Sequence, residues 1–162
     1  MTTLDSIVLD LPEAMVPVTV DDDRLGIDGV DRAATTVRES RRWLSDDGLY
    51  VLATVSPAAK PADLDPLALD LVVGETIERY RAHFDGIADS VVKIDVTGAL
   101  AGRGARVHLT SASGERLELM LVAALTPDRD VVVVQATWAA SLASHFADRA
   151  RALGRSIAIP PA

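Results

Sequence analysis

Residues 105–138 constrain the fold more than any other part of the sequence. They contain three apolar runs, which are separated at residues 111–114 and 126–130 by segments rich in turn-forming residues. In the middle run every second residue from Leu117 to Leu125 is apolar, the two-residue period of a half-buried strand. The last run opens with four consecutive valines at 131–134, which suits an interior strand covered on both faces. This stretch therefore predicts a three-stranded antiparallel meander.

The rest of the chain predicts further elements around this meander. Alternating apolar residues predict an amino-terminal hairpin over residues 7–20 and strands over 49–55 and 90–100. Asp65 and Pro66 form a helix-start pair, and an apolar stripe of helical spacing follows as far as Phe84, with Gly86 as the expected C-terminal cap. A second helix is expected near residues 140–155. The predicted fold is α+β: an antiparallel sheet of about six strands with two main helices packed on it.

Composition limits the classes of function. A chain of 162 residues with 49% hydrophobic and 25% charged residues is expected to form one globular domain over 1–162. It has no cysteine, which excludes a disulfide framework, a thiolate zinc site and a cysteine nucleophile. The net charge is −8, which makes nucleic acid an unsuitable partner because phosphates require a basic surface.

The sequence also predicts where the protein is found. No run approaches the ~20 apolar residues that a membrane span needs, so we expect no stable membrane insertion. The first fifteen residues lack the basic and apolar regions of a signal peptide. The expected location is therefore the cytoplasm.

Two groups of side chains are candidates for binding a partner. Arg38, Arg41 and Arg42 stand beside Trp43 and could bind carboxylates of a partner, with the indole as an anchor. The competing interpretation, which we favour, is structural: Trp43 packs in the core and the arginines pair with nearby acidic residues. The second group is Arg106 and His108, which alternate with apolar residues and so are expected on a polar strand face.

No catalytic or metal-binding motif is present in the sequence. The three histidines, His83, His108 and His145, match no zinc-binding spacing and are expected at the surface. The serines at 111 and 113 belong to a predicted turn and not to a nucleophile motif. Three adjacent aspartates at 21–23 lack the spacing of a calcium loop and favour a solvated turn. We therefore expect no cofactor and no metal.

As a whole, the chain resembles the PsbP-like superfamily, which includes Ran-binding Mog proteins, LpqN-type lipoproteins and Eag-type secretion chaperones. The resemblance rests on the order of features along the chain: Leu11-Pro12, a strand ending at Pro57, Leu64-Asp65-Pro66, residues 98–102 (GALAG), the hairpin at Ser113-Gly114, the strand at 131–137 and the helix ending at Ser156-Ile157. It implies one α/β/α sandwich that binds other molecules without a metal or cofactor. No functional residue of the family can be transferred to this sequence.

The resulting hypothesis is a non-enzymatic cytoplasmic adaptor or secretion-type chaperone that binds another protein, such as a secreted client. One alternative is a carrier of a small apolar ligand, in a pocket lined by Phe84, Met120, Val122 and Phe146. Another alternative is an enzyme, which would need His83 or His145 in a cleft against a carboxylate. A homodimer through an exposed sheet face or edge is also considered.

Overall fold

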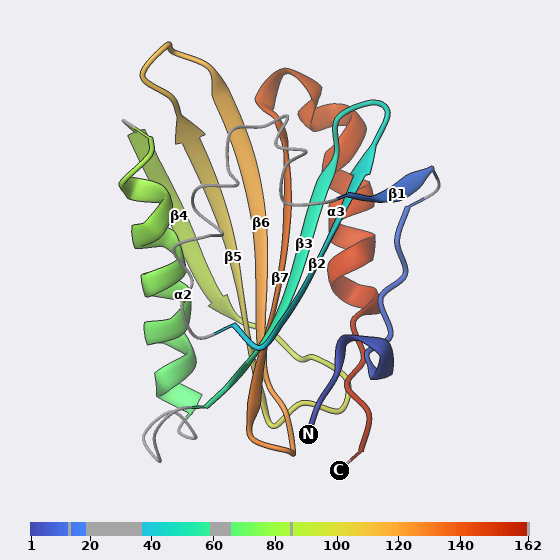
Figure 1. Cartoon of the computed structure of the whole chain (residues 1–162). Helices are drawn as coiled ribbons and strands as arrows, with labels where there is room; N and C mark the ends of the chain where they lie inside the picture. The colour runs from blue at the N-terminus through green and yellow to red at the C-terminus, as the bar shows by residue number, and fades with distance from the viewer. Residues whose placement is uncertain (13, 19–36, 59–65, 85, 162) are drawn as a thin grey trace.

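The chain forms an open antiparallel sheet with one helix on each face (Figure 1). The computed structural model describes residues 1–12, 14–18, 37–58, 66–84 and 86–161. The sheet has seven strands in the order β1-β2-β3-β7-β6-β5-β4, so the predicted α+β class is confirmed, with seven strands where about six were expected. The strands are β1 (Met15–Val18), β2 (Glu39–Ser45), β3 (Tyr50–Pro57), β4 (Gly86–Lys93), β5 (Ala101–Thr110), β6 (Arg116–Leu125) and β7 (Asp130–Ala139). The helices are α2 (Pro66–Arg81), α3 (Ala143–Ser156) and the short 3-10 helices η1 (Leu4–Ser6) and η3 (Ala140–Leu142).

The predicted meander is confirmed and forms the middle of the sheet. β5 pairs with β6, and β6 with β7, in continuous antiparallel register. Apolar residues at odd positions of β6 belong to the core under α2, whereas Val122 and Ala124 belong to the core under α3. β7 is buried on both faces from Asp130 to Trp138, as its run of valines predicted.

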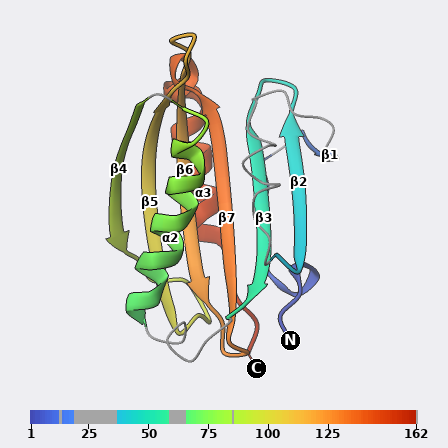
Figure 2. The same cartoon turned by 60° about the vertical axis from the view of Figure 1, so that its left-hand side comes forward.

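Helix α2 covers one face of the sheet, where it packs mainly on β5 and β6 (Figure 2). Its apolar stripe supplies Leu69, Val73, Ile77 and Tyr80, all at most 4% exposed. The Tyr80 hydroxyl donates a hydrogen bond of 2.5 Å to Gln135 Oε1 on β7. We call this side of the sheet the α2 face.

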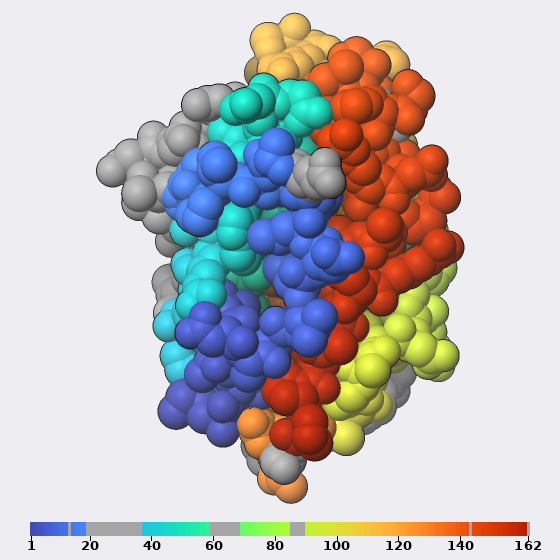
Figure 3. Space-filling model, turned by 90° about the vertical axis from the view of Figure 1, so that its right-hand side faces the viewer, coloured from blue at the N-terminus to red at the C-terminus, as the bar shows by residue number. Residues whose placement is uncertain are grey.

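Helix α3 covers the opposite side, the α3 face, where it packs on β7 and β6. Phe146, Ala150 and Leu153 of the helix are at most 1% exposed. The amino-terminal segment and the carboxy-terminal tail lie side by side on this face (Figure 3), and Val8 and Ala158 exchange backbone hydrogen bonds there. The covering layer of the α3 face is therefore made from both ends of the chain.

The amino-terminal hairpin was a wrong prediction. Residues 7–11 form no strand, although Val8 makes an isolated bridge, and β1 pairs with β2 instead. The alternation at Ile7, Leu9 and Leu11 arises because these side chains pack on the α3 face. β2 was not predicted, since polar residues occupy both of its faces close to the sheet edge.

Two boundaries also differ from the prediction. α2 ends at Arg81, and Gly86 opens β4 and does not cap the helix. The strand expected over 90–100 is β4, which ends at Lys93. Gly98 then turns the chain with φ +80°, a conformation that favours glycine, and passes so close to Ile159 that a Cβ would collide with its backbone oxygen. The aspartates at 21–23 and Asp65 lie outside the described residues.

Candidate functional site

Arg38 is held within the chain by the start of β7. Its guanidinium donates two hydrogen bonds to the carboxylate of Asp130, at 3.0 and 2.8 Å, and one of 2.6 Å to the Thr2 carbonyl oxygen. The bonds from Arg38 lower the pKa of the Asp130 carboxyl, which is only 5% exposed. These contacts give Arg38 a structural part in joining the first residues to β2 and β7.

The other three residues of this group lie on β2 but point to different faces of the sheet. Arg41 forms an ion pair with Asp5 at 2.7 Å, and Trp43 is half-buried against the core of the α3 face. Arg42 alternates with them and so lies on the α2 face, where it donates a hydrogen bond of 3.5 Å to Ser40. The sequence neighbours are therefore not one cluster, and their part in binding a partner stays a prediction.

Arg106 and His108 lie on the α3 face of β5, which three strands separate from β2. Both side chains are about half-exposed, at 45% and 57%. Between them stands the nearly buried carboxylate of Glu118 on β6, 3.7 Å from Arg106 Nη2 and 3.5 Å from His108 Nδ1. The indole N–H of the buried Trp138 donates to the same carboxylate at 2.9 Å. A nearly buried carboxylate, fixed by Trp138, thus lies between two half-exposed side chains.

These two residues belong to a part of the sheet that helix α3 does not cover. Ser90 and Val92 of β4 complete it, because they pair with Arg106 and Gly104 in the sheet. Val92 is 55% exposed, and its cross-strand neighbour Gly104 has no side chain to cover it. We call Ser90, Val92, Arg106 and His108 the β4–β5 patch.

The polar side chains of β4, β5 and β6 do not all lie on one face of the sheet. Arg106, His108 and Glu118 share the α3 face, whereas Lys93 pairs with Arg103 and lies on the α2 face. Glu118 and Trp138 form the pair that sequence reasoning did not recognise. The available signal was a glutamate in an otherwise apolar run, opposite a tryptophan in the neighbouring strand.

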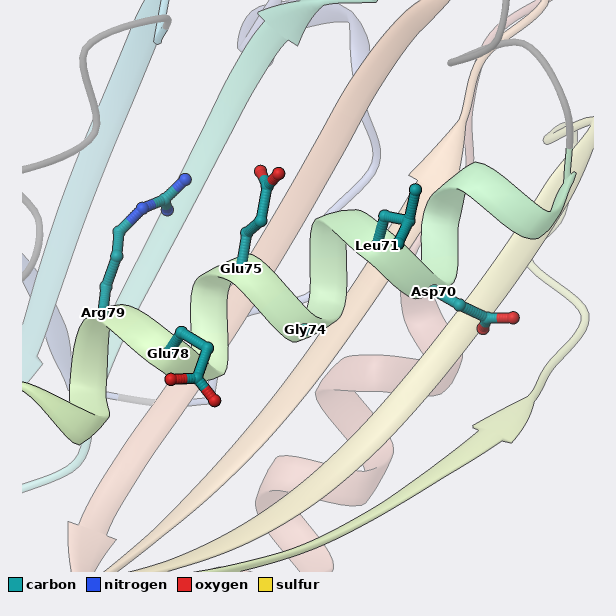
Figure 4. A pocket seen from close by; sticks show the side chains of 6 residues that line it. All are labelled: Asp70, Leu71, Gly74, Glu75, Glu78 and Arg79. Atoms are coloured by element: carbon teal, nitrogen blue, oxygen red, sulfur yellow. The ribbon is translucent and has the colours of Figure 1, made fainter.

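Two shallow hollows lie on the other side of β4, along α2. The larger, of about 590 Å³, follows the outer surface of the helix and is lined by Asp70, Leu71, Gly74, Glu75, Glu78 and Arg79 (Figure 4). The second, of about 340 Å³, is a groove between α2 and β4 that reaches Ile77 and Val91. Gly74 contributes to both because a Cβ there would meet open space.

His145 meets a carboxylate, as the enzyme alternative required, but the geometry is not that of a nucleophile and its base. Its Nε2 lies 2.9 Å from Asp47 Oδ2, and Ser45 donates its hydroxyl to the same aspartate. Ser45, followed by His145, lowers the pKa of Asp47 to about 2. In a hydrolytic triad the histidine lies between serine and aspartate, whereas here the aspartate lies between the other two.

The structure also bears on the remaining candidates for catalysis, metal binding and membrane insertion. His83 is exposed just beyond the end of α2. Among the described residues, no three His, Cys, Asp or Glu side chains gather in a way that could hold a metal ion. In the same part of the chain, no helix is long and apolar enough to cross a membrane.

The four residues expected to line a pocket for a small apolar ligand lie on opposite faces of the sheet. Phe84 belongs to the core of the α2 face, and Met120, Val122 and Phe146 pack in the core of the α3 face. The sheet itself separates them. They cannot line a single pocket.

Solved structures of the Mog/PsbP/LpqN-type fold match this chain, so the sheet and its two helices have that fold. The resemblance inferred from the sequence is thus confirmed at the level of the fold. LpqN of Mycobacterium tuberculosis, involved in cell envelope biogenesis, matches with a TM-score of 0.61 and 13% identity over 96% of this chain and 83% of LpqN. The Ran-binding protein Mog1p of Saccharomyces cerevisiae matches at 0.57 and 12% over 96% of this chain and 91% of Mog1p.

A cyanobacterial protein of this fold gives the same TM-score as LpqN. Cyanobacterial PsbP from Synechocystis sp. PCC 6803 gives a TM-score of 0.61 and 10% identity, over 98% of this chain and 89% of that protein. No protein-family model matches the sequence, and no curated protein matches it. At these identities the similarity establishes the fold alone.

Proposed function

We propose that this protein is a non-enzymatic adaptor or secretion-type chaperone that binds a segment of another protein. The β4–β5 patch is the observation that carries the proposal. It combines an exposed valine with the half-exposed side chains of Arg106 and His108, which flank Glu118. A surface with an apolar contact and nearby charge-assisted hydrogen-bond donors suits recognition of a polypeptide.

The fold comparisons support a binding role without identifying the partner. Mog1p, which has this fold, is a Ran-binding protein, and LpqN is involved in building a cell envelope. The Ser45, Asp47 and His145 contacts supply no nucleophile with its base. A binding function needs no such catalytic arrangement, so it fits these residues better than an enzymatic function does.

Site-specific crosslinking in the source cells tests the proposal. A photo-reactive amino acid at Val92 should give a defined crosslinked product with another protein. The matched control places it at Ala152, which is exposed on α3, and should give no such product. The substitution Arg106→Glu should reduce the product at Val92 at least tenfold, whereas Arg151→Glu, which changes an exposed arginine on α3, should not. Identical products at both positions would contradict the proposal.

Three expectations from the sequence stay predictions. Fractionation of the source cells tests the cytoplasmic location, and native mass spectrometry tests both the homodimer and the carrier of a small ligand. The division of the four expected lining residues between two faces removes the original argument for the carrier. A bound small mass in the native spectrum would restore that alternative.

A further inference from the structure

The two edges of the sheet differ in how well they are protected against pairing with another strand. β1, at one edge, has four residues and contains Pro17, which has no N–H to offer. β4, at the other edge, has eight residues and no proline. It is the last strand in the sheet order, and both Val91 and Val92 are exposed on it, at 40% and 55%. β4 is therefore the edge better suited to accept a further strand.

The backbone of β4 presents hydrogen-bonding groups to that open side. Ile94 donates its N–H to the Gly102 oxygen at 3.3 Å, so Ile94 is bonded toward β5. In an antiparallel pair these positions alternate. Val92 and Ser90 are consequently bonded toward β5 as well, while the N–H and C=O of Val91 and Lys93 point away from it.

The two sides of this edge differ in chemistry. On the α2 face Val91 borders the groove of about 340 Å³ that also contains Ile77. The carboxylates beside that groove already have partners, since Asp70 pairs with Arg103 and Glu78 with Arg81. On the α3 face the edge leads to the β4–β5 patch with its two basic side chains. A strand added here would meet Val91 and a groove of mixed polar and apolar lining on one side, and Arg106 and His108 on the other.

Arg106 has capacity for a second carboxylate. Its separation of 3.7 Å from Glu118 is too long for a hydrogen bond, and among the described residues no other group pairs with it. Ser90 stands between Arg106 and the open edge and is small. Strands lie about 4.8 Å apart, so a residue on an added strand would be about 10 Å from Arg106 across Ser90. An extended arginine and a glutamate together span that distance.

From this geometry we infer that β4 accepts an extended segment of the partner protein as an eighth strand. The segment carries Asp or Glu on the side facing Arg106 and His108, and apolar residues on the side facing Val91 and the groove. Main-chain hydrogen bonds to Val91 and Lys93 provide affinity, and the alternating side chains provide specificity. This inference rests on the proposed binding function and defines the chemistry of the partner.

A second copy of this chain fits the site less well. Pairing two β4 strands antiparallel about Val91 would place Val92 of the second copy opposite Ser90. Arg106 would then gain an apolar neighbour on the α3 face and no carboxylate from that position. A partner with acidic residues satisfies the guanidinium, and a second copy in this register does not.

Synthetic peptides test the inference with the full-length protein. The probe is a nine-residue peptide that alternates valine and glutamate, and the controls replace glutamate by lysine or methylate alternate backbone nitrogens. The glutamate peptide should bind at least tenfold more tightly than either control, as measured by calorimetry. Equal binding of the methylated peptide would overturn strand addition, because methylation removes the N–H donors that pair with the edge.

Variants of the protein locate the binding to this edge. Val91→Pro removes the outward N–H and changes the side chain at the groove without removing a hydrogen bond to β5, and should abolish binding. Arg106→Glu should reverse the preference in favour of the lysine peptide. Arg151→Glu, the matched control on α3, should leave both affinities unchanged. Circular dichroism of each variant confirms that it folds. If Val91→Pro bound the peptide as the parent does, the inference would be wrong.

The outcomes separate this inference from the proposed function. Crosslinks at Val92 in cells, combined with no peptide binding, would overturn the strand inference and leave the adaptor proposal standing. Absence of crosslinks at Val92 would count against the adaptor proposal itself. Self-association that Val91→Pro abolishes and the glutamate peptide does not compete with would identify a second copy as the occupant, which also overturns the inference.

Discussion

Asp130 shows how a single buried carboxylate organises distant parts of the chain. It opens β7, and its side chain accepts hydrogen bonds from Arg38 and from the Thr2 backbone N–H, the latter at 2.8 Å. The Thr126 hydroxyl accepts the backbone N–H of Asp130 at 3.0 Å and so closes the turn before the strand. The carboxylate therefore joins the amino-terminal residues, β2 and β7 at one point.

The substitution Asp130→Asn tests this part at the residue scale. The change should lower the free energy of unfolding by about 2–3 kcal/mol, because Arg38 would lose its charged partner in a mostly buried place. Urea denaturation measures the loss. The control is Arg41→Gln, which breaks the exposed pair with Asp5 and should cost much less than Asp130→Asn. If the two variants lost equal free energy of unfolding, burial of the Arg38–Asp130 pair would not increase its contribution to stability.

At the scale of elements, α3 is fastened to the turn between β2 and β3 by one aspartate. Asp47 lies 2.9 Å from His145 and 3.3 Å from Arg149, two residues one helical turn apart. Gly48 follows with φ +101°, which lets the turn close without strain. The packing of α3 on the sheet is thus supplemented at its amino-terminal end by polar contacts.

These contacts predict a specific dependence of stability on pH. The folded-state pKa of Asp47 is about 2, below its ordinary value of 3.8, so its stabilising contribution is present above pH 3.8 and lost as the pH falls through 2. The carboxylate is 44% exposed, so the contribution should be below about 1 kcal/mol. Asp47→Asn should accordingly be less stable than the parent at pH 5 in urea denaturation, and the difference should shrink below pH 3.8 and vanish below pH 2. A constant difference between the two would contradict this explanation.

The sequence predicts some elements of this protein well and others poorly, for physical reasons. The meander and both helices have apolar residues at the period of their secondary structure, because one layer covers each face. β2 lacks that period, since Arg41 and Arg42 stand on opposite faces of it. Ile7, Leu9 and Leu11 have the apolar spacing of a strand, but they form no hairpin. Their side chains instead pack on the core of the α3 face and help to cover it.

The candidate site was predictable only in part. Arg106 and His108 of β5 could be assigned to one face from their alternation with apolar residues. The pairing of Glu118 with Trp138 depends on the register between β6 and β7, which the sequence does not specify by itself. The open character of the patch depends on where α3 comes to lie on the sheet, and that is a property of the assembled fold.

At the scale of the whole molecule, one sheet supports two cores. Because β6 and β7 contribute to both, loss of either core should unfold the entire sheet. Leu119→Ala on the α2 face and Leu153→Ala on the α3 face should each cost about 2–5 kcal/mol. In both variants tryptophan fluorescence, which reports on Trp43 and Trp138 of the α3 face, should follow the same transition as far-ultraviolet circular dichroism. Separate transitions in the Leu119 variant would show that the two cores unfold independently.

The bridge between Val8 and Ala158 has a consequence for engineering the molecule. It brings the first and last residues of the chain to the same end of the sheet, where Figure 1 marks both termini. The turn at Ser113 and Gly114, at the opposite end of the sheet, is exposed. A circular permutant that joins the old termini by a short linker and opens the chain at this turn keeps every strand pairing intact.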